Sequence, residues 1–236
     1  MSFSPEFSGV RRYLRRLSKG FSLFPLLARL GSTESPDDPV EVAKFALRTP
    51  VIRPKQVPRE LIQFASMVAN KKPRSVLEIG TNLGGTLFVL CRLADPSATL
   101  ISLDLPGGQF GGGYRWFQAL LFQHFPSRGQ RLHLIRDNSH KFDVWERVAA
   151  ILQDQKLDLL FIDGDHTYQG VRTDFEMYSP LVRTGGMIVF HDIVQHPADV
   201  KCGVSYFWNE IKIRYRHEEI TENPTQGWAG IGVLFT

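Results

Sequence analysis

The stretch Ser75-Val-Leu-Glu-Ile-Gly-Thr-Asn-Leu-Gly-Gly-Thr86 combines three patterns that together decide the fold. Val76, Leu77 and Ile79 form a short apolar run, which is typical of a buried parallel strand. Glycines follow at once, and an apolar segment of helical character begins at Thr86. A strand, a glycine-rich turn and a helix in this order present backbone N–H groups and a helix N-terminus to a ligand.

The rest of the chain repeats this alternation of strand and helix. Apolar runs occur at 75–79, 98–103, 131–135, 157–162 and 186–190, and helical patterns at 86–94, 115–124, 142–153 and 168–178. The alternation predicts a doubly wound α/β fold, with a parallel sheet covered by helices on both faces. We expect one more helix at 203–215, then two strands near 217–221 and 230–235 that pair antiparallel at the sheet edge. The sheet would then be mostly parallel and seven-stranded.

Composition indicates a globular cytoplasmic protein. With 236 residues, 43% of them hydrophobic and 22% charged, the chain fits one large domain with an extension better than a disordered chain. We assign residues 1–50 to the extension and linker, with helical character at 40–48, and residues 51–236 to the domain. The two cysteines, Cys91 and Cys202, argue against a disulfide framework and favour a reducing compartment. No apolar run reaches the ~20 residues that a membrane span needs, and we expect no secretory signal.

The net charge of +4 comes mainly from the N-terminal segment. Its basic residues are Arg11, Arg12, Arg15, Arg16, Lys19 and Arg29. Two interpretations stay open: a basic amphipathic helix that contacts anionic lipid, or an arm that packs on its own domain or on a second subunit. The arm is favoured, because the apolar part follows the basic part instead of sharing one helical face with it. The remaining chain is close to neutral, so we expect that it binds no nucleic acid. We also expect a homo-oligomer.

Polar residues end every apolar run of the predicted sheet. In a doubly wound sheet, ligands bind at the carboxyl ends of the strands. The residues at those ends are Glu78 and Gly80; Asp104; Asp137, Asn138 and Ser139; Asp163, Asp165 and His166; and His191 and Asp192. Because these ends meet at one edge of the sheet, the sequence predicts a ligand site there.

The pattern around Gly80 favours a nucleoside-containing cofactor that is not a dinucleotide. Asp104 follows Gly80 by a little over twenty residues, and a carboxylate at that position can accept hydrogen bonds from both hydroxyls of a ribose. The glycine spacing does not match G-x-G-x-x-G. The negative carboxylate of Glu78 would also be unfavourable beside a pyrophosphate, whereas it would be favourable beside a positively charged amine or sulfonium.

These residues resemble those of class I S-adenosylmethionine (SAM)-dependent methyltransferases, because 78–84 is similar to their E-x-G-x-x-x-G signature. The resemblance covers about residues 50–236. Within that superfamily, 161–174, 185–192 and 203–208 resemble the small-molecule O-methyltransferases, a group that includes cephalosporin-hydroxylase-like and macrolide-sugar enzymes. The resemblance implies a Rossmann-like fold and methyl transfer to a hydroxyl of a small molecule such as a sugar or another natural product.

The resemblance also implies roles for single residues. The methionine end of the cofactor pocket would be shaped by Glu78, Gly80, Thr81, Gly84 and Thr86, with Asn82 in the same turn. Asp104 would hold the ribose of the cofactor, and Asp137 and Ser139 would flank its adenine. Asp165 would face the amine of the cofactor. Asp163, His191 and Asp192 would hold a divalent cation, Mg²⁺ or Mn²⁺. His166 would be the general base, with Asp163 also in the catalytic set.

His191 departs from the family pattern, which usually has a carboxylate there. Magnesium prefers oxygen ligands, whereas imidazole suits transition metals. Two alternatives therefore stay open: a metal site, or a pair in which His191 and Asp192 bond to neighbouring backbone. For His166 the alternative to a general base is a helix-start residue bonded to backbone, but its place beside Asp165 at a strand end favours the base.

The chemistry agrees with the resemblance. An aliphatic hydroxyl is a weak nucleophile, and a histidine with a pKa near ~6.5 can take its proton. A metal ion would acidify the hydroxyl. Two loops, 106–116 and 191–202, would shape the acceptor site, although the glycine-rich first loop can also be read as a plain connection. Rival interpretations are a metal-dependent hydroxylase-like enzyme and a non-catalytic cofactor-binding protein.

Overall fold

The computed structural model describes residues 38–107, 113–114, 116–223 and 225–236, without the side chains of Trp116 and Phe117. The basic N-terminal segment and most of the glycine-rich loop lie outside the described residues, so the predictions made for them stay predictions. Among the described helices, none is long and apolar enough to cross a bilayer.

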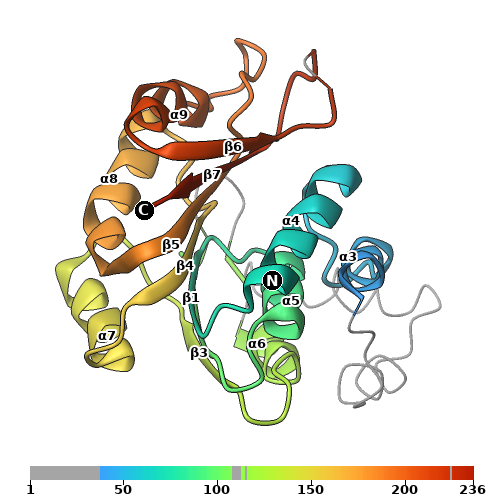
Figure 1. Ribbon diagram of the computed structural model, residues 1–236, viewed down its shortest axis with the longest axis vertical. Helices are drawn as coiled ribbons and strands as arrows, with labels where there is room; N and C mark the ends of the chain where they lie inside the picture. Colours follow the sequence, from blue (N-terminus) through green and yellow to red (C-terminus); the bar gives the residue numbers. More distant parts are fainter. Residues whose placement is uncertain (1–37, 108–112, 115, 224) are drawn as a thin grey trace, which may run out of the picture.

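Within the described residues, one seven-stranded sheet runs through the molecule in the order β3-β2-β1-β4-β5-β7-β6 (Figure 1). The strands are β1 Ser75–Ile79, β2 Thr99–Leu103, β3 Arg131–Ile135, β4 Leu157–Ile162, β5 Val182–His191, β6 Arg216–Ile220 and β7 Ile231–Phe235. The first five are parallel, and β7 pairs antiparallel with both β5 and β6. The predicted fold class is therefore confirmed.

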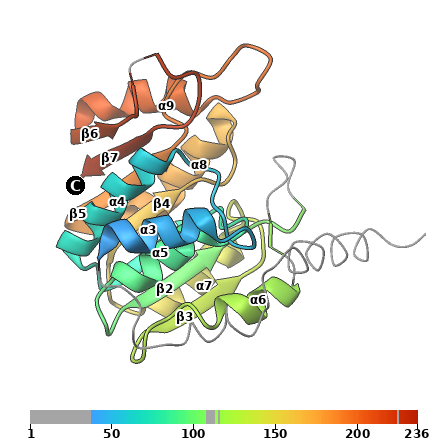
Figure 2. The ribbon, with the colours of Figure 1, turned by 90° about the vertical axis from the view of Figure 1, so that its right-hand side faces the viewer.

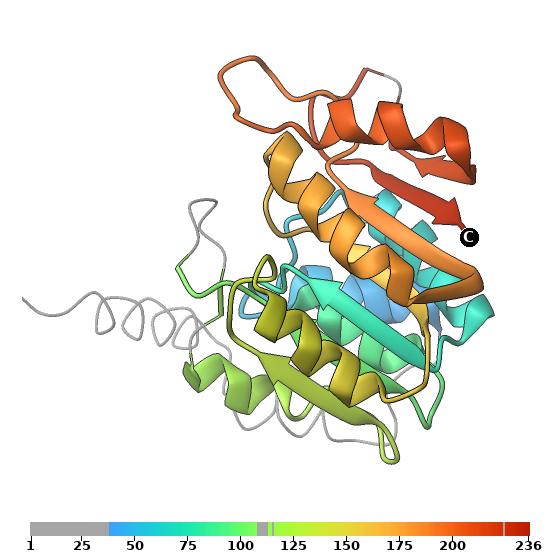
Figure 3. The same ribbon diagram turned by 90° about the vertical axis from the view of Figure 1, so that its left-hand side faces the viewer.

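Helices cover both faces of the sheet. Helices α3 Pro39–Arg48, α4 Pro58–Lys71, α5 Gly85–Leu93 and α6 Trp116–Phe122 lie on one face (Figure 2). Helices α7 Phe142–Leu152, α8 Tyr168–Tyr178 and α9 Val204–Ile211 lie on the other, in yellow to red-orange in Figure 3. Short 3₁₀ turns follow α8 at Ser179–Leu181 and α9 at Lys212–Arg214.

The apolar run of β1 divides between two hydrophobic cores. Val76 packs into the core under α3 to α6, whereas Leu77 and Ile79 pack into the core under α7 to α9. This division follows from the alternation of side chains along a strand, and it explains why a strand buried on both faces is a continuous apolar run.

Helix α3 is part of the first core. Val42, Ala43 and Ala46 are buried there together with Phe88 of α5. Its first turn is capped by Asp38, whose Oδ1 accepts a hydrogen bond from Val40 N at 3.0 Å. The boundary between extension and domain near residue 50 remains a prediction.

Strand β5 begins at Val182, earlier than the predicted run at 186–190. Gly185 and Gly186 carry no apolar side chain, so the hydrophobic pattern could not reveal this part of the strand. The register between β4 and β5 shifts between Leu157 and Leu159. Glycine inside a strand often marks such an irregularity in strand pairing.

The loop after β3 is anchored on α8 by His140 and Asp174. His140 Nε2 lies 3.3 Å from Asp174 Oδ1, and the Asp174 side chain is fully buried. The ion pair with Asp174 raises the pKa of His140. Since the folded-state pKa is raised, this contact stabilises the protein fully at pH values below the unfolded pKa, and the stabilisation disappears as pH rises through the folded value.

We therefore expect His140→Asn to lower the free energy of unfolding by about 1–3 kcal/mol at pH 5.5, because it leaves Asp174 without its partner. The difference from wild type should shrink at pH 8.5. Urea denaturation at both pH values measures it, with His217→Asn on exposed β6 as the control variant. An equal loss at both pH values would contradict the prediction.

Candidate active site

The turn between β1 and α5 needs its glycines. Gly80 has φ +94°, and a Cβ there would lie 2.0 Å from the main-chain oxygen of Asp163. Gly84 has φ +84° and is the N-cap of α5, and a Cβ there would lie 2.6 Å from the Phe122 ring. The two positions thus combine left-handed backbone with close packing, and only glycine satisfies both.

Asp104, at the end of β2, faces this turn. Its Oδ2 accepts hydrogen bonds from Asn82 N at 2.7 Å and Tyr114 N at 3.3 Å. Burial raises the pKa of Asp104 to about 6, although these backbone donors partly oppose the shift. Asn82 itself is left-handed, with φ +51°. The carboxylate is therefore held at the sheet edge beside Gly80, where a ligand would meet it.

Glu78 lies beneath the turn. Its side chain is fully buried, and Thr81 Oγ1 donates a hydrogen bond to Oε2 at 2.7 Å. Thr81 Oγ1 also lies 2.7 Å from Ser102 Oγ. Burial raises the pKa of Glu78 well above its ordinary value. Glu78 and Thr81 therefore support the turn from below.

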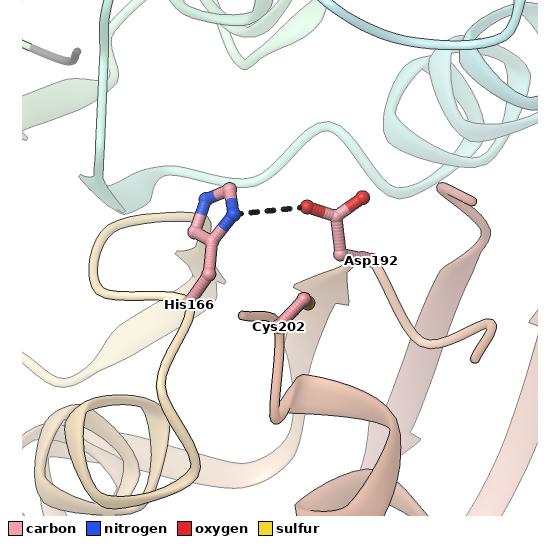
Figure 4. Close-up of side chains that lie close together, drawn as sticks. All are labelled: His166, Asp192 and Cys202. Carbon is pink, nitrogen blue, oxygen red and sulfur yellow. Dashed lines mark ion pairs between the residues drawn. The ribbon is translucent and has the colours of Figure 1, made fainter. Parts of the chain in front are cut away.

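A second group of polar side chains gathers at the ends of β4 and β5. His166 Nδ1 lies 3.1 Å from Asp192 Oδ2, and His166 Nε2 lies 3.4 Å from Asp163 Oδ1 (Figure 4 shows the first pair). His191 Nδ1 lies 3.2 Å from Asp163 Oδ1 and 3.4 Å from Asp192 Oδ1. The three predicted metal ligands, Asp163, His191 and Asp192, thus meet, with one donor atom from each within 4.8 Å of the others.

The histidines and aspartates of this group shift one another's pKa values. Burial lowers the pKa of His191, but Asp163 and Asp192 outweigh it and raise the pKa to about 9. The same balance of burial against the two carboxylates raises the pKa of His166. In return, the imidazoles hold the pKa of Asp163 and of Asp192 below the usual range despite burial. A cation bound by the carboxylates would lower the pKa of both imidazoles again.

Two further members of the group come from the loop after β5. Asp192 has φ +63°, a left-handed conformation that aspartate tolerates better than most residues. His196 Nε2 lies 3.1 Å from Asp192 Oδ1, and Cys202 also joins the group. The sequence analysis assigned no individual role to His196 or Cys202, although it expected their loop, 191–202, to shape the acceptor site. The four-residue spacing from Asp192 to His196 was the available signal.

A cavity of about 270 Å³ joins the two groups. It is lined by Lys55, Gly80, Asn82, Asp104, Asp163, Gly164, His166, His191, Asp192, His196 and Trp228. Lys55 and Trp228 were not expected from the sequence. Glu60, buried on α4, accepts hydrogen bonds from Gln226 Nε2 and, at 3.0 Å, from Gly230 N. Glu60 therefore holds the β6–β7 loop that carries Trp228.

The other predicted cofactor residues make structural contacts and are absent from that lining. Asp137 pairs with Lys141 Nζ at 2.9 Å, and Ser139 O accepts a hydrogen bond from Tyr178. Asp165 Oδ1 accepts from Thr167 N at 2.9 Å, at the start of α8. Thr86 Oγ1 accepts from Gln56 Nε2 at 3.0 Å. Their cofactor roles stay predictions.

A family model described as a methyltransferase domain matches residues 77–193, which run from β1 to the end of β5 and contain the Gly80 turn, Asp104, Asp163, His166, His191 and Asp192. The chain therefore contains a SAM-dependent methyltransferase domain of the class I fold. This assignment confirms the resemblance and favours methyl transfer over the hydroxylase interpretation.

Solved structures share the fold of this methyltransferase. An O-methyltransferase from Bacillus cereus in complex with SAH has a TM-score of 0.57 at 16% identity, over 90% of this chain and 97% of that one. MycE from the mycinamycin biosynthetic pathway, in complex with Mg, SAH and mycinamycin VI, has a TM-score of 0.58 at 17% identity, over 95% of this chain and 62% of that one.

Among curated proteins, the uncharacterized protein y4gI of Sinorhizobium fredii is 24% identical over 145 residues, which are 59% of the methyltransferase chain. The uncharacterized protein R132 of Acanthamoeba polyphaga mimivirus is 58% identical over 36 residues, 15% of the chain. The methyltransferase chain covers only 15% and 16% of the length of these two relatives.

Proposed function

We propose that this methyltransferase transfers the methyl group to a hydroxyl of a small molecule, of the sugar or natural-product class, with His166 as the general base. The observation that carries the proposal is the position of His166. Its imidazole lies between Asp163 and Asp192 and lines the same cavity as Gly80 and Asp104. The O-methyltransferases among the structural neighbours support the same acceptor class.

The residues present fit the cofactor. SAM carries a ribose diol and a positively charged amine and sulfonium, and it supplies an electrophilic methyl group when bound. Asp104 would accept hydrogen bonds from the diol, and Gly80 and Asn82 line the cavity beside it. The acidic lining of the cavity suits a cation better than a pyrophosphate.

His166 would take the proton from the acceptor hydroxyl. Proton transfer by a positioned side chain contributes ~10²–10⁴-fold to rate. Asp192 contacts Nδ1 at 3.1 Å and orients the imidazole, and Nε2, which has a longer contact of 3.4 Å with Asp163, would accept the proton of the hydroxyl. Lys55 and Trp228, which line the cavity from outside the sheet, would contact the acceptor.

Asp163, His191 and Asp192 would hold a divalent cation that acidifies the same hydroxyl. A set of two carboxylates and one imidazole fits Mn²⁺ better than Mg²⁺, because magnesium prefers oxygen ligands alone. The structural neighbour MycE is in complex with Mg, which supports a divalent cation in this proposal.

The proposal is tested by incubating the full chain with SAM, Mn²⁺ or Mg²⁺, and a panel of sugars, polyols, phenols and amines. SAH formation reports turnover, and mass spectrometry with NMR locates the new methyl group. We expect an O-methyl product and a lower rate after chelation of the metal. Methylation only of nitrogen or carbon acceptors would refute the proposal.

The affinity for SAM should depend on the ionisation of Asp104. With a folded pKa of about 6, the carboxylate gains a proton as pH falls, and a protonated Asp104 accepts the ribose hydroxyls less well. Calorimetry should show Kd for SAM rising about tenfold between pH 7 and pH 5. In Asp104→Asn, Kd should be high and nearly constant with pH. A wild-type Kd that does not change over this range would exclude the ribose role.

A further inference from the structure

We propose that His166, Asp192 and Cys202 form a second cation site, which takes a zinc-class transition-metal ion. The three residues come from three segments: the loop after β4, the end of β5, and the residues just before α9 (Figure 4). One donor atom from each lies within 4.8 Å of the other two. Metal bonds of ~2.0–2.3 Å in a tetrahedral site place donors roughly 3.3–3.8 Å apart, so closing the site needs only small side-chain movements.

The backbone holds these donors in place. Gly203 N donates a hydrogen bond to His166 O at 2.7 Å, which ties the segment of Cys202 directly to that of His166. A Cβ at Gly203 would lie 2.4 Å from Tyr168 N, so the contact with the start of α8 is close. Asp192 is fixed by its left-handed backbone at the end of β5. The arrangement is therefore set by the fold as well as by side-chain rotamers.

The donor types select the ion. An imidazole nitrogen, a carboxylate oxygen and a thiolate sulfur suit Zn²⁺ and Co²⁺, whereas Mg²⁺ takes oxygen ligands. Binding would release the thiol proton of Cys202 to solvent, and the sulfur would then bond to the metal. Three protein ligands leave a fourth position for water.

Because the site shares Asp192 with the set of Asp163 and His191, the two cations would compete for that carboxylate. A metal on His166 Nδ1 would also lower the basicity of Nε2. Zinc-class ions should therefore inhibit methyl transfer. This consequence rests on the proposed function, whereas binding of the ion does not.

The test is a Co²⁺ titration of the metal-free full chain, followed by absorption spectroscopy. We expect a near-ultraviolet thiolate-to-cobalt charge-transfer band that Zn²⁺ abolishes and a large excess of Mg²⁺ leaves in place. Cys202→Ser and His166→Gln should lose the band. Cys91→Ala is the matched control, because Cys91 is the other cysteine and is buried in α5. Circular dichroism confirms that each variant is folded.

Absence of the band in wild type, its persistence in Cys202→Ser, or its displacement by Mg²⁺ would each overturn the proposal. In the methyl-transfer assay, the zinc concentration for half-inhibition should rise at least tenfold in Cys202→Ser, and no rise would refute the inhibitory role. A cobalt band without any O-methylation would refute the proposed function and leave the metal site standing.

Discussion

Replacing His166 with glutamine is expected to lower kcat about 10²–10⁴-fold, because it removes the group that takes the acceptor proton. Glutamine keeps a polar side chain near Asp163 and Asp192, so the carboxylates retain a hydrogen-bond donor. Initial rates of SAH formation at saturating SAM and acceptor measure the effect. The Kd for SAM, measured by calorimetry, should stay within about threefold of wild type, since Asp104 and the Gly80 turn are unchanged.

His124→Gln is the control for this experiment. His124 is exposed just after α6, and its Nδ1 contacts only Leu120 O, at 2.9 Å, among the interactions that the structure gives for it. Its kcat should equal that of wild type. A His166→Gln enzyme that keeps at least one third of the wild-type kcat would show that His166 is not the base. A fall in kcat matched by an equal loss of SAM affinity would show a positioning role.

Replacing Gly80 with alanine should have the second large effect. The added methyl group would lie 2.0 Å from the main-chain oxygen of Asp163, where β1 and β4 are neighbours. Overpacking against backbone and the left-handed φ of +94° together should cost about 2–5 kcal/mol of unfolding free energy. Urea denaturation measures this loss. We also expect the Kd for SAM to rise at least tenfold, because the turn must move.

Gly107 provides the matched control for Gly80→Ala. It has φ +76°, but a Cβ there would meet nothing within 4 Å. Gly107→Ala should therefore cost only the backbone strain, about 1–2 kcal/mol. Equal losses at the two positions would show that close packing at Gly80 contributes nothing.

The predicted fold succeeded because its signals are local. The apolar runs at 75–79 and 157–162 coincide with β1 and β4, since a strand buried on both faces needs apolar residues on both sides. The run at 131–135 coincides with β3, which is an edge strand and only partly buried. The strand-end rule also predicted which polar side chains lie together, while their roles stay predictions. Once the strands are parallel, topology brings Asp104, Asp163 and Asp192 to one edge of the sheet.

Inside the loops, closeness in sequence did not predict which side chains lie close together in the structure. Asp165 lies two residues from Asp163, yet its carboxylate accepts a hydrogen bond from Thr167 N and contacts the start of α8. Trp228 is distant from every site residue in the sequence, yet it lines the cavity because Glu60 on α4 holds its loop. Such contacts depend on packing between segments, for which no local pattern exists.

The sequence by itself determined the doubly wound sheet, the glycine turn at Gly80 and the set of acids and histidines at the carboxyl edge. These features depend on the period of apolar side chains, on backbone conformation and on strand direction, and short stretches of sequence determine all three. Only the tertiary structure decided which of these side chains face one another. It placed Asp192 among His166, His196 and Cys202, because a left-handed residue at the end of β5 and the hydrogen bond from Gly203 to His166 bring distant segments together.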